Sequence, residues 1–172
     1  MVKIHWAAKD VPDDLSTASA LKADIDNNTW VKLMSAMKDK HPVSDYAMPT
    51  NGGDNRLDIT LVPNLGEQEG DGTEKGYLGI TNRRDRSKCG NVAVDISVRS
   101  NLPLAELIST VAHEMMHAVL FAFSSGYCAE YQSLNEATAT WFEDVAHPAY
   151  YYGHLAAPAF LNTASLPLED KG

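Results

Sequence analysis

The pentapeptide His113-Glu114-Met115-Met116-His117 constrains this chain more than any other stretch. It lies in a segment, Leu104 to Phe123, whose apolar residues recur at helical spacing: Leu104, Leu107, Ile108, Val111, Met115, Val119 and Ala122. That period predicts a helix. Residues four apart share a helix face, so His113 and His117 can direct both imidazoles at one point. Glu114 lies about 100° further round and can reach a water there without being a ligand. The pattern points to metal-dependent hydrolysis; two histidines at the edge of a core are the structural alternative.

Glu136 is the candidate third ligand. It follows His117 after eighteen residues, in a second expected helix that runs from Ser133 to about Ala146, where His147-Pro148 stops it. Catalytic zinc usually takes three protein ligands and leaves a fourth position for water, and two histidines with a glutamate form one of the standard sets. Ser133 and Glu136 also have the spacing of a capping box, which needs no metal, although a cap can also aim the carboxylate. The predicted zinc ligands are His113, His117 and Glu136, with Glu114 as general base.

The two motifs at this spacing resemble the gluzincins, the thermolysin-like superfamily of zinc metallopeptidases. Leu134-Asn135-Glu136, with Ala139 and Glu143, is similar to the second motif of the aminopeptidase branch, and His117-Ala118-Val119 looks like thermolysin. The run from Ala137 to Asp144 more closely resembles a family of bacterial gluzincin-like proteases. The resemblance covers about Arg56 to Leu168. It implies a zincin-like catalytic domain, a peptide or protein substrate and a secreted or extracytoplasmic location.

The sequence departs from these relatives at the orienting residue. Thr140 stands where thermolysin has an aspartate one turn after the ligand glutamate, which leaves open the partner of a zinc-bound histidine. Phe123 stands where a metzincin requires a third histidine, so that branch is excluded. A donor must also stabilise the tetrahedral oxyanion, and that role stays open among three candidates: Tyr127, Tyr151 and His154.

Length and charge limit the other classes. A chain of 172 residues with 44% hydrophobic content suits one domain over residues 1–172, either a minimal catalytic half or a fragment lacking a C-terminal subdomain. A formal net charge of −9 disfavours nucleic acid as a partner. No apolar run reaches the roughly 18 residues that cross a bilayer. The N-terminus lacks a signal-peptide core, so an exported protein would have its leader outside this chain. Peptide specificity and oligomeric state are not specified.

The order of the expected elements indicates an α+β fold, with a small mixed or antiparallel sheet packed against helices. Residues 1–15 show no clear period and are expected to form an arm. A helix is expected from Thr17 to Lys40, ended by His41-Pro42, and Asn27-Asn28 can split it. Strands are expected at Arg56–Val62, Tyr77–Thr81 and Asn91–Val98. The acidic segment between the first two, residues 64–76, is expected to be a solvated loop rather than a calcium site.

Three alternatives remain open from sequence alone. The strand at Asn91–Val98 leads into the predicted zinc helix, and the gluzincin resemblance implies that it pairs with substrate; an ordinary sheet strand is the alternative. Cys89 and Cys128 flank that helix and either form a disulfide or remain two buried thiols. Finally, the fold can serve as a non-catalytic module that binds zinc or a protein partner. With Glu114 and all three ligands present, the peptidase is the leading hypothesis.

Overall fold

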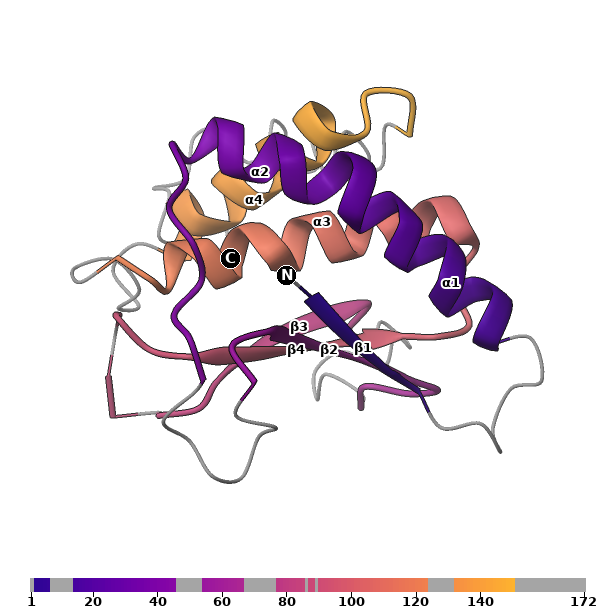
Figure 1. Ribbon diagram of the computed structural model, residues 1–172, viewed down its shortest axis with the longest axis horizontal. Coiled ribbons are helices and arrows are strands. Elements are labelled where there is room, and N and C mark those ends of the chain that lie inside the picture. The colour runs from indigo at the N-terminus through magenta and orange to yellow at the C-terminus, as the bar shows by residue number, and fades with distance from the viewer. Residues whose placement is uncertain are drawn as a thin grey trace, which may run out of the picture.

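A four-stranded mixed sheet with helices over one face forms the framework of the molecule (Figure 1). The computed structural model describes residues 2–6, 14–45, 54–66, 77–85, 87–88, 90–123 and 132–150. The elements in chain order are β1 (Val2–Trp6), α1 (Asp14–Asp24), the π-helical turn η1 (Ile25–Thr29), α2 (Trp30–Ala36), β2 (Leu57–Val62), β3 (Gly79–Arg83), β4 (Val94–Arg99), α3 (Leu104–Leu120) and α4 (Gln132–Ala146). The expected α+β class, with a small mixed sheet packed against helices, is confirmed.

The strand order places the strand before α3 inside the sheet. The order is β1-β2-β4-β3; β1, β2 and β4 run parallel, and β3 is antiparallel to β4. Because β4 is hydrogen-bonded to β2 on one side and to β3 on the other, it has no free edge and is an ordinary sheet strand. Within the described part of the chain β3 pairs with β4 alone, so β3 is the edge strand on this side of the sheet.

The prediction of an N-terminal arm over residues 1–15 is wrong for its first residues, because Val2–Trp6 forms the strand β1. Each residue of this strand pairs in parallel with β2, from Val2 opposite Leu57 to Trp6 opposite Leu61. His5 Nε2 also lies 2.8 Å from Oδ1 of Asp58. Val2, Ile4 and Trp6 alternate with Lys3 and His5, so these residues did carry the short alternation that indicates a strand. The strand exists because β2, which lies more than fifty residues further along the chain, offers it an edge.

The other three strands form close to where alternation predicts them. Ile59 and Leu61 of β2 are buried, as are Ile96 and Val98 of β4, so their apolar residues face the helices as expected. The strand expected at Tyr77–Thr81 begins and ends two residues later, as β3 (Gly79–Arg83). Its ends follow from its register against β4, in which Gly79 lies opposite Val98 and Arg83 opposite Val94. Pairing with a neighbour, which sequence does not show, sets such boundaries.

The helix expected over Thr17–Lys40 is interrupted at Asn27-Asn28, as the sequence suggested. The interruption is the π-helical turn η1, which joins α1 to α2 without breaking the helical path. Helical structure ends at Ala36, four residues earlier than expected. Lys38 and Asp39 have φ of 50° and 61°, the left-handed conformation that terminates helices.

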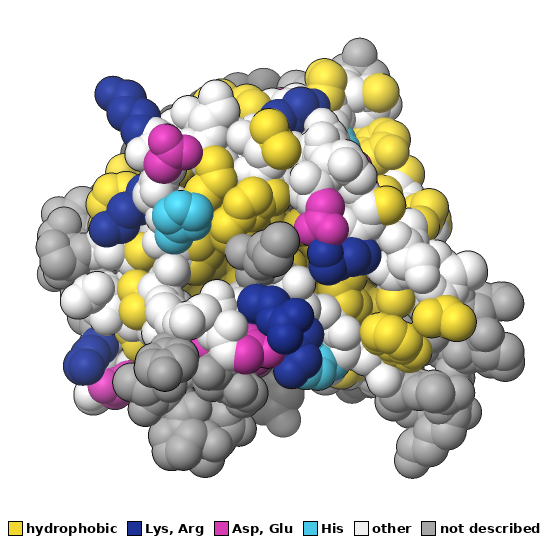
Figure 2. Space-filling view, viewed as in Figure 1, with side chains coloured by type: hydrophobic (Ala, Val, Ile, Leu, Met, Phe, Trp, Pro, Cys, Tyr) yellow, Lys and Arg dark blue, Asp and Glu magenta, His cyan; other side chains and the backbone are white. Residues whose placement is uncertain are grey.

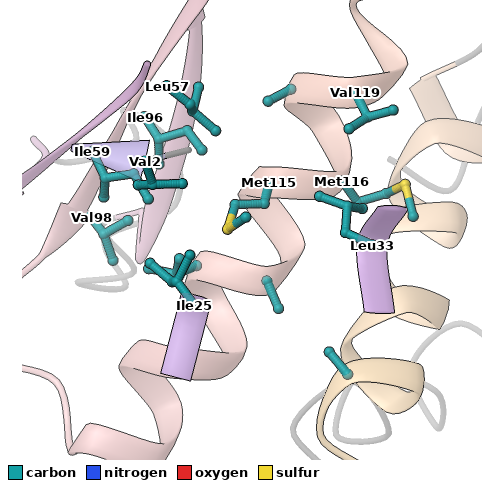
Figure 3. Packing of buried hydrophobic residues seen from close by; sticks show 14 of the residues in the cluster. Val2, Ile25, Leu33, Leu57, Ile59, Ile96, Val98, Met115, Met116 and Val119 are labelled. Carbon is teal, nitrogen blue, oxygen red and sulfur yellow. The ribbon is translucent and has the colours of Figure 1, made fainter. Parts of the chain in front are cut away.

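Helix α3 is the centre of the hydrophobic core. It packs against β3, β4, α1 and α4. In Figure 3, Met115 is directed toward the strands and Ile25, whereas Met116 is directed toward Leu33 of α2. Both methionines are fully buried, so the two central residues of the HExxH motif fill the core on either side of α3. His113 and His117 lie on a different face of α3 from these two methionines.

A shallow apolar groove of about 480 Å³ lies between β1 and α1. Figure 2 shows apolar side chains on this face, with charged side chains around them. Among the groove's basic lining residues, Lys3 and Arg56 pair with Asp54, and Lys22 pairs with Asp26. No helix in the described ranges is long and apolar enough to cross a membrane. The predictions for residues 67–76 and for Cys89 and Cys128 lie outside the described residues.

Candidate metal centre

The two histidines of the HExxH motif meet on one face of α3. Because α3 is continuous from Leu104 to Leu120, His113 and His117 lie one turn apart. Their rings are 4.7 Å apart between centroids and nearly perpendicular, at 73°. The two Nε2 atoms lie only 3.0 Å from each other. Two neutral imidazoles with their lone pairs directed at each other would repel, so this geometry calls for a proton or a cation between them.

Helix α4 brings Glu136 to the same point. One carboxylate oxygen, Oε2, lies 3.3 Å from Nε2 of His113, and the other, Oε1, lies 3.5 Å from Nε2 of His117. The three side chains form a group whose ligand atoms could hold a metal ion. Nitrogen and oxygen ligands at about 2.0–2.1 Å from a tetrahedral zinc ion are separated from each other by about 3.3 Å. The spacing of the three predicted ligands therefore fits zinc, and the donor set suits it.

Exposure differs among the three side chains. His117 is buried, with a side chain 5% exposed, whereas half of the Glu136 side chain is exposed to solvent. The group is therefore walled on the α3 side and accessible from the Glu136 side. A catalytic zinc site needs such an opening, because one coordination position must admit water or substrate.

Glu143 is the carboxylate that orients His113, a role that the sequence left unassigned because Thr140 stands where an aspartate was expected. Its Oε1 lies 2.7 Å from Nδ1 of His113, and its Oε2 accepts a hydrogen bond of 2.8 Å from Oγ of Ser109. A carboxylate only accepts, so Nδ1 carries the hydrogen and Nε2 of a neutral His113 is left to face the centre. The sequence held a signal for this role: Glu143 follows Glu136 by seven residues, or about two turns, and so lies on the same face of α4.

Glu114 lies beside the predicted ligands and is buried against β3. Its side chain is 6% exposed, and its Oε2 accepts a hydrogen bond of 2.6 Å from Oγ1 of Thr81. Burial raises the pKa of Glu114, and the nearby imidazoles of His113 and His117 counteract part of that rise. A carboxylate with a raised pKa is a stronger base than a solvated one, which suits proton transfer near neutral pH.

The charges of the group favour a cation at its centre. Burial disfavours the charged form of His113, but hydrogen bonds to Glu136 and Glu143 outweigh burial and raise its pKa to about 10. Burial likewise disfavours the Glu136 carboxylate, but its contacts with His113 and His117 hold the pKa of Glu136 well below its usual range. The carboxylates thus stabilise positive charge at the imidazoles, and a bound metal dication would meet the same field.

The structure brings together His113, His117, Glu136 and Glu114, and it adds Glu143, Ser109 and Thr81, whose contacts the sequence did not predict. The candidate oxyanion donors Tyr127, Tyr151 and His154 lie outside the described residues. Comparisons with protein-family models, with curated proteins and with solved structures find no match to this chain. A functional reading of the site therefore depends on its residues and their geometry.

Proposed function

We propose that this chain is a zinc-dependent peptidase of the gluzincin type, with a zincin-like catalytic domain. One observation carries the proposal: three side chains on two helices converge, with Nε2 of His113, Nε2 of His117 and the Glu136 carboxylate 3.0–3.5 Å from one another. The number of residues between the histidines and Glu136 is that of the gluzincin motif. A carboxylate at Glu114 adjoins them. These are the ligand set and the general base that hydrolysis by a metal-activated water requires.

The mechanism assigns each side chain one task. His113, His117 and Glu136 would hold the zinc, which would lower the pKa of a bound water toward about 7 and polarise the scissile carbonyl. Glu114 takes a proton from the attacking water as its oxygen bonds to the carbonyl carbon. Glu114 then passes that proton to the leaving nitrogen as the C–N bond breaks. Glu143 keeps the imidazole of His113 in its orientation.

The position of β3 favours an extended peptide as the substrate. This strand has a single sheet partner among the described residues, and Thr81 on it contacts Glu114. An unpaired strand edge offers N–H and C=O groups to which an extended chain can add. A peptide bound along that edge would pass close to the general base.

Zinc analysis combined with hydrolysis of casein or a fluorogenic peptide mixture tests the proposal. The purified protein is expected to hold one zinc per chain and to cleave, and Glu114→Gln is expected to lose about 10²–10⁴-fold in kcat while keeping its zinc. Glu106→Gln, which makes the same change near the start of α3, is the matched control and should retain activity. Undiminished activity in Glu114→Gln would falsify the mechanism. Stoichiometric zinc without hydrolysis would instead assign the chain as a binding module.

A further inference from the structure

Strand β3 aims two consecutive inward-facing residues at α3. In its antiparallel register, Thr81 lies opposite Ile96 and Gly79 opposite Val98. Residues paired across a sheet point to the same face. Since Ile96 and Val98 are buried in the core beneath the helices, Thr81 and Gly79 also face the helices. The sheet register therefore determines that these two residues meet α3.

Thr81 contacts the side chain of Glu114 directly. Its Oγ1 lies 2.6 Å from Oε2 of Glu114 and 3.0 Å from the main-chain oxygen of the same residue. A hydroxyl has one hydrogen to donate, and the shorter distance favours the carboxylate. Threonine is stiff at χ1, so a hydroxyl held on a paired strand has little freedom to move. Oε2 of the buried carboxylate is thereby held in place.

Gly79 allows β3 to lie this close to Glu114. A Cβ at this position would be 2.8 Å from Cγ of Glu114, 2.8 Å from Cγ2 of Thr110 and 2.9 Å from Oε1 of Glu114. Such separations are shorter than carbon atoms tolerate, so an added methyl group would displace the Glu114 side chain or the strand. Position 79 therefore requires glycine, because the Glu114 side chain occupies the space that a Cβ would need.

We propose that Thr81 is a positioning residue for Glu114, and that Gly79 provides the close approach that lets it act. The inference rests on the proposed function, because it assigns to Glu114 the role of general base. Side chains that hold a catalytic group within a fraction of an ångström of its productive geometry contribute strongly to rate, and a misplacement of about 1 Å can cost about 10²-fold. The Thr81 hydroxyl therefore acts on kcat through Glu114, by fixing the position of the carboxylate.

Two near-isosteric substitutions separate positioning from packing. Thr81→Val keeps the shape and removes the hydroxyl, and Thr81→Ser keeps the hydroxyl and removes the methyl group. In the zinc-loaded enzyme, Thr81→Val is expected to lower kcat about 10- to 100-fold with KM and zinc affinity unchanged. Thr81→Ser should recover most of that loss. Thr60→Val, on the opposite face of the same sheet, is the matched control and should behave as the unsubstituted protein.

A measurement without metal tests the contact independently of catalysis. In the metal-free protein, Thr81→Val is expected to raise the unfolding equilibrium constant about tenfold, because it leaves a buried carboxylate without its donor. In a Glu114→Ala background the same substitution should have a clearly smaller effect. If the two effects are equal, or if Thr81→Val retains full kcat in an active enzyme, the positioning role is overturned. If the chain does not hydrolyse peptides, the proposed function is refuted. The stability coupling between Thr81 and Glu114 in the metal-free protein then still tests whether Thr81 holds the carboxylate.

Discussion

At the scale of single residues, two successive contacts hold the imidazole of His113, the side chain that we propose as a zinc ligand. Its Nδ1 is held by Glu143, and Glu143 is in turn held by Ser109, one turn before His113 on α3. Both oxygens of the Glu143 carboxylate are therefore used, and the imidazole has little freedom to rotate. A carboxylate partner of this kind fixes the tautomer of a ligating histidine and increases its basicity.

Removing the charge of Glu143 should weaken zinc binding without removing a ligand. Glu143→Gln is expected to lower zinc affinity about 10- to 100-fold, because a neutral amide increases the basicity of His113 less than a carboxylate and can present either its oxygen or its NH₂ group to Nδ1. Competition with a chromophoric chelator measures the affinity directly. Glu106→Gln on α3 provides the control for a lost negative charge. Equal affinities in Glu143→Gln and in the unsubstituted protein would show that His113 is oriented by other contacts.

At the scale of elements, the π-helical turn η1 and the first turn of α2 are joined to the C-terminal end of α4. Asn28 Nδ2 and Lys32 Nζ both donate to the main-chain oxygen of Ala146, at 3.2 and 2.6 Å. Oγ1 of Thr29 lies 2.9 Å from Nε2 of the buried His147, directly after α4. The last carbonyls of a helix lack partners within it, and here Asn28 of η1 and Lys32 of α2 supply donors for that of Ala146. The same helix carries Glu136 and Glu143, so η1 and α2 together steady the element that completes the candidate metal site.

The junction between η1 and α4 should weaken in acid through His147. Burial lowers the pKa of His147 and Lys32 acts in the same direction, whereas Asp24 and Glu143 oppose the shift. A histidine whose pKa is lower in the folded state takes up its proton more readily when unfolded. Its contribution to stability is therefore present above the usual pKa of 6.5 and is lost as the pH falls through the lower, folded value.

Urea unfolding of the metal-free protein at a series of pH values measures this contribution. The free energy of unfolding is expected to fall as the pH drops below about 6.5, and to fall less steeply in His147→Gln, which cannot titrate. Since the other titrating groups are common to both proteins, the difference between the two slopes isolates His147. Parallel pH dependences in the two proteins would contradict the prediction.

At the scale of the whole molecule, zinc would connect parts of the fold that the chain keeps apart. His113 and His117 come from α3 and Glu136 from α4, and α3 also packs against the sheet and α1. The ligands have this geometry only when both helices are folded and packed. Metal binding should therefore favour the folded state as a whole.

Thermal unfolding with and without zinc tests this linkage. At free zinc about 1,000 times the dissociation constant, the free energy of unfolding is expected to rise by about 4 kcal/mol. For a chain of this size that corresponds to a rise of roughly 8–16 °C in Tm. Glu136→Ala should lose most of the shift, and magnesium, which prefers oxygen ligands in octahedral geometry, should produce none. A Tm that zinc does not change would exclude a site formed by these three residues.

The sequence alone determined the elements whose information is local. Apolar residues at helical spacing predicted α3, and the HExxH pattern predicted that His113 and His117 share a face. Alternation over six to eight residues predicted β2 and β4 close to their observed positions. In each case the signal lies within one or two turns, or within one strand, so that intrinsic periodicity is sufficient.

Only the tertiary structure decided the contacts that join distant segments. The strand β1 has a short alternation of its own, but its pairing depends on an edge provided by β2, which lies more than fifty residues further along the chain. The orienting contact of Glu143 joins two helices across thirty residues, and that of Thr81 joins a strand to a helix across thirty-three. Strand order made β4 an interior strand and β3 an edge. Such pairings depend on packing and register, which are properties of the folded chain rather than of any short stretch of it.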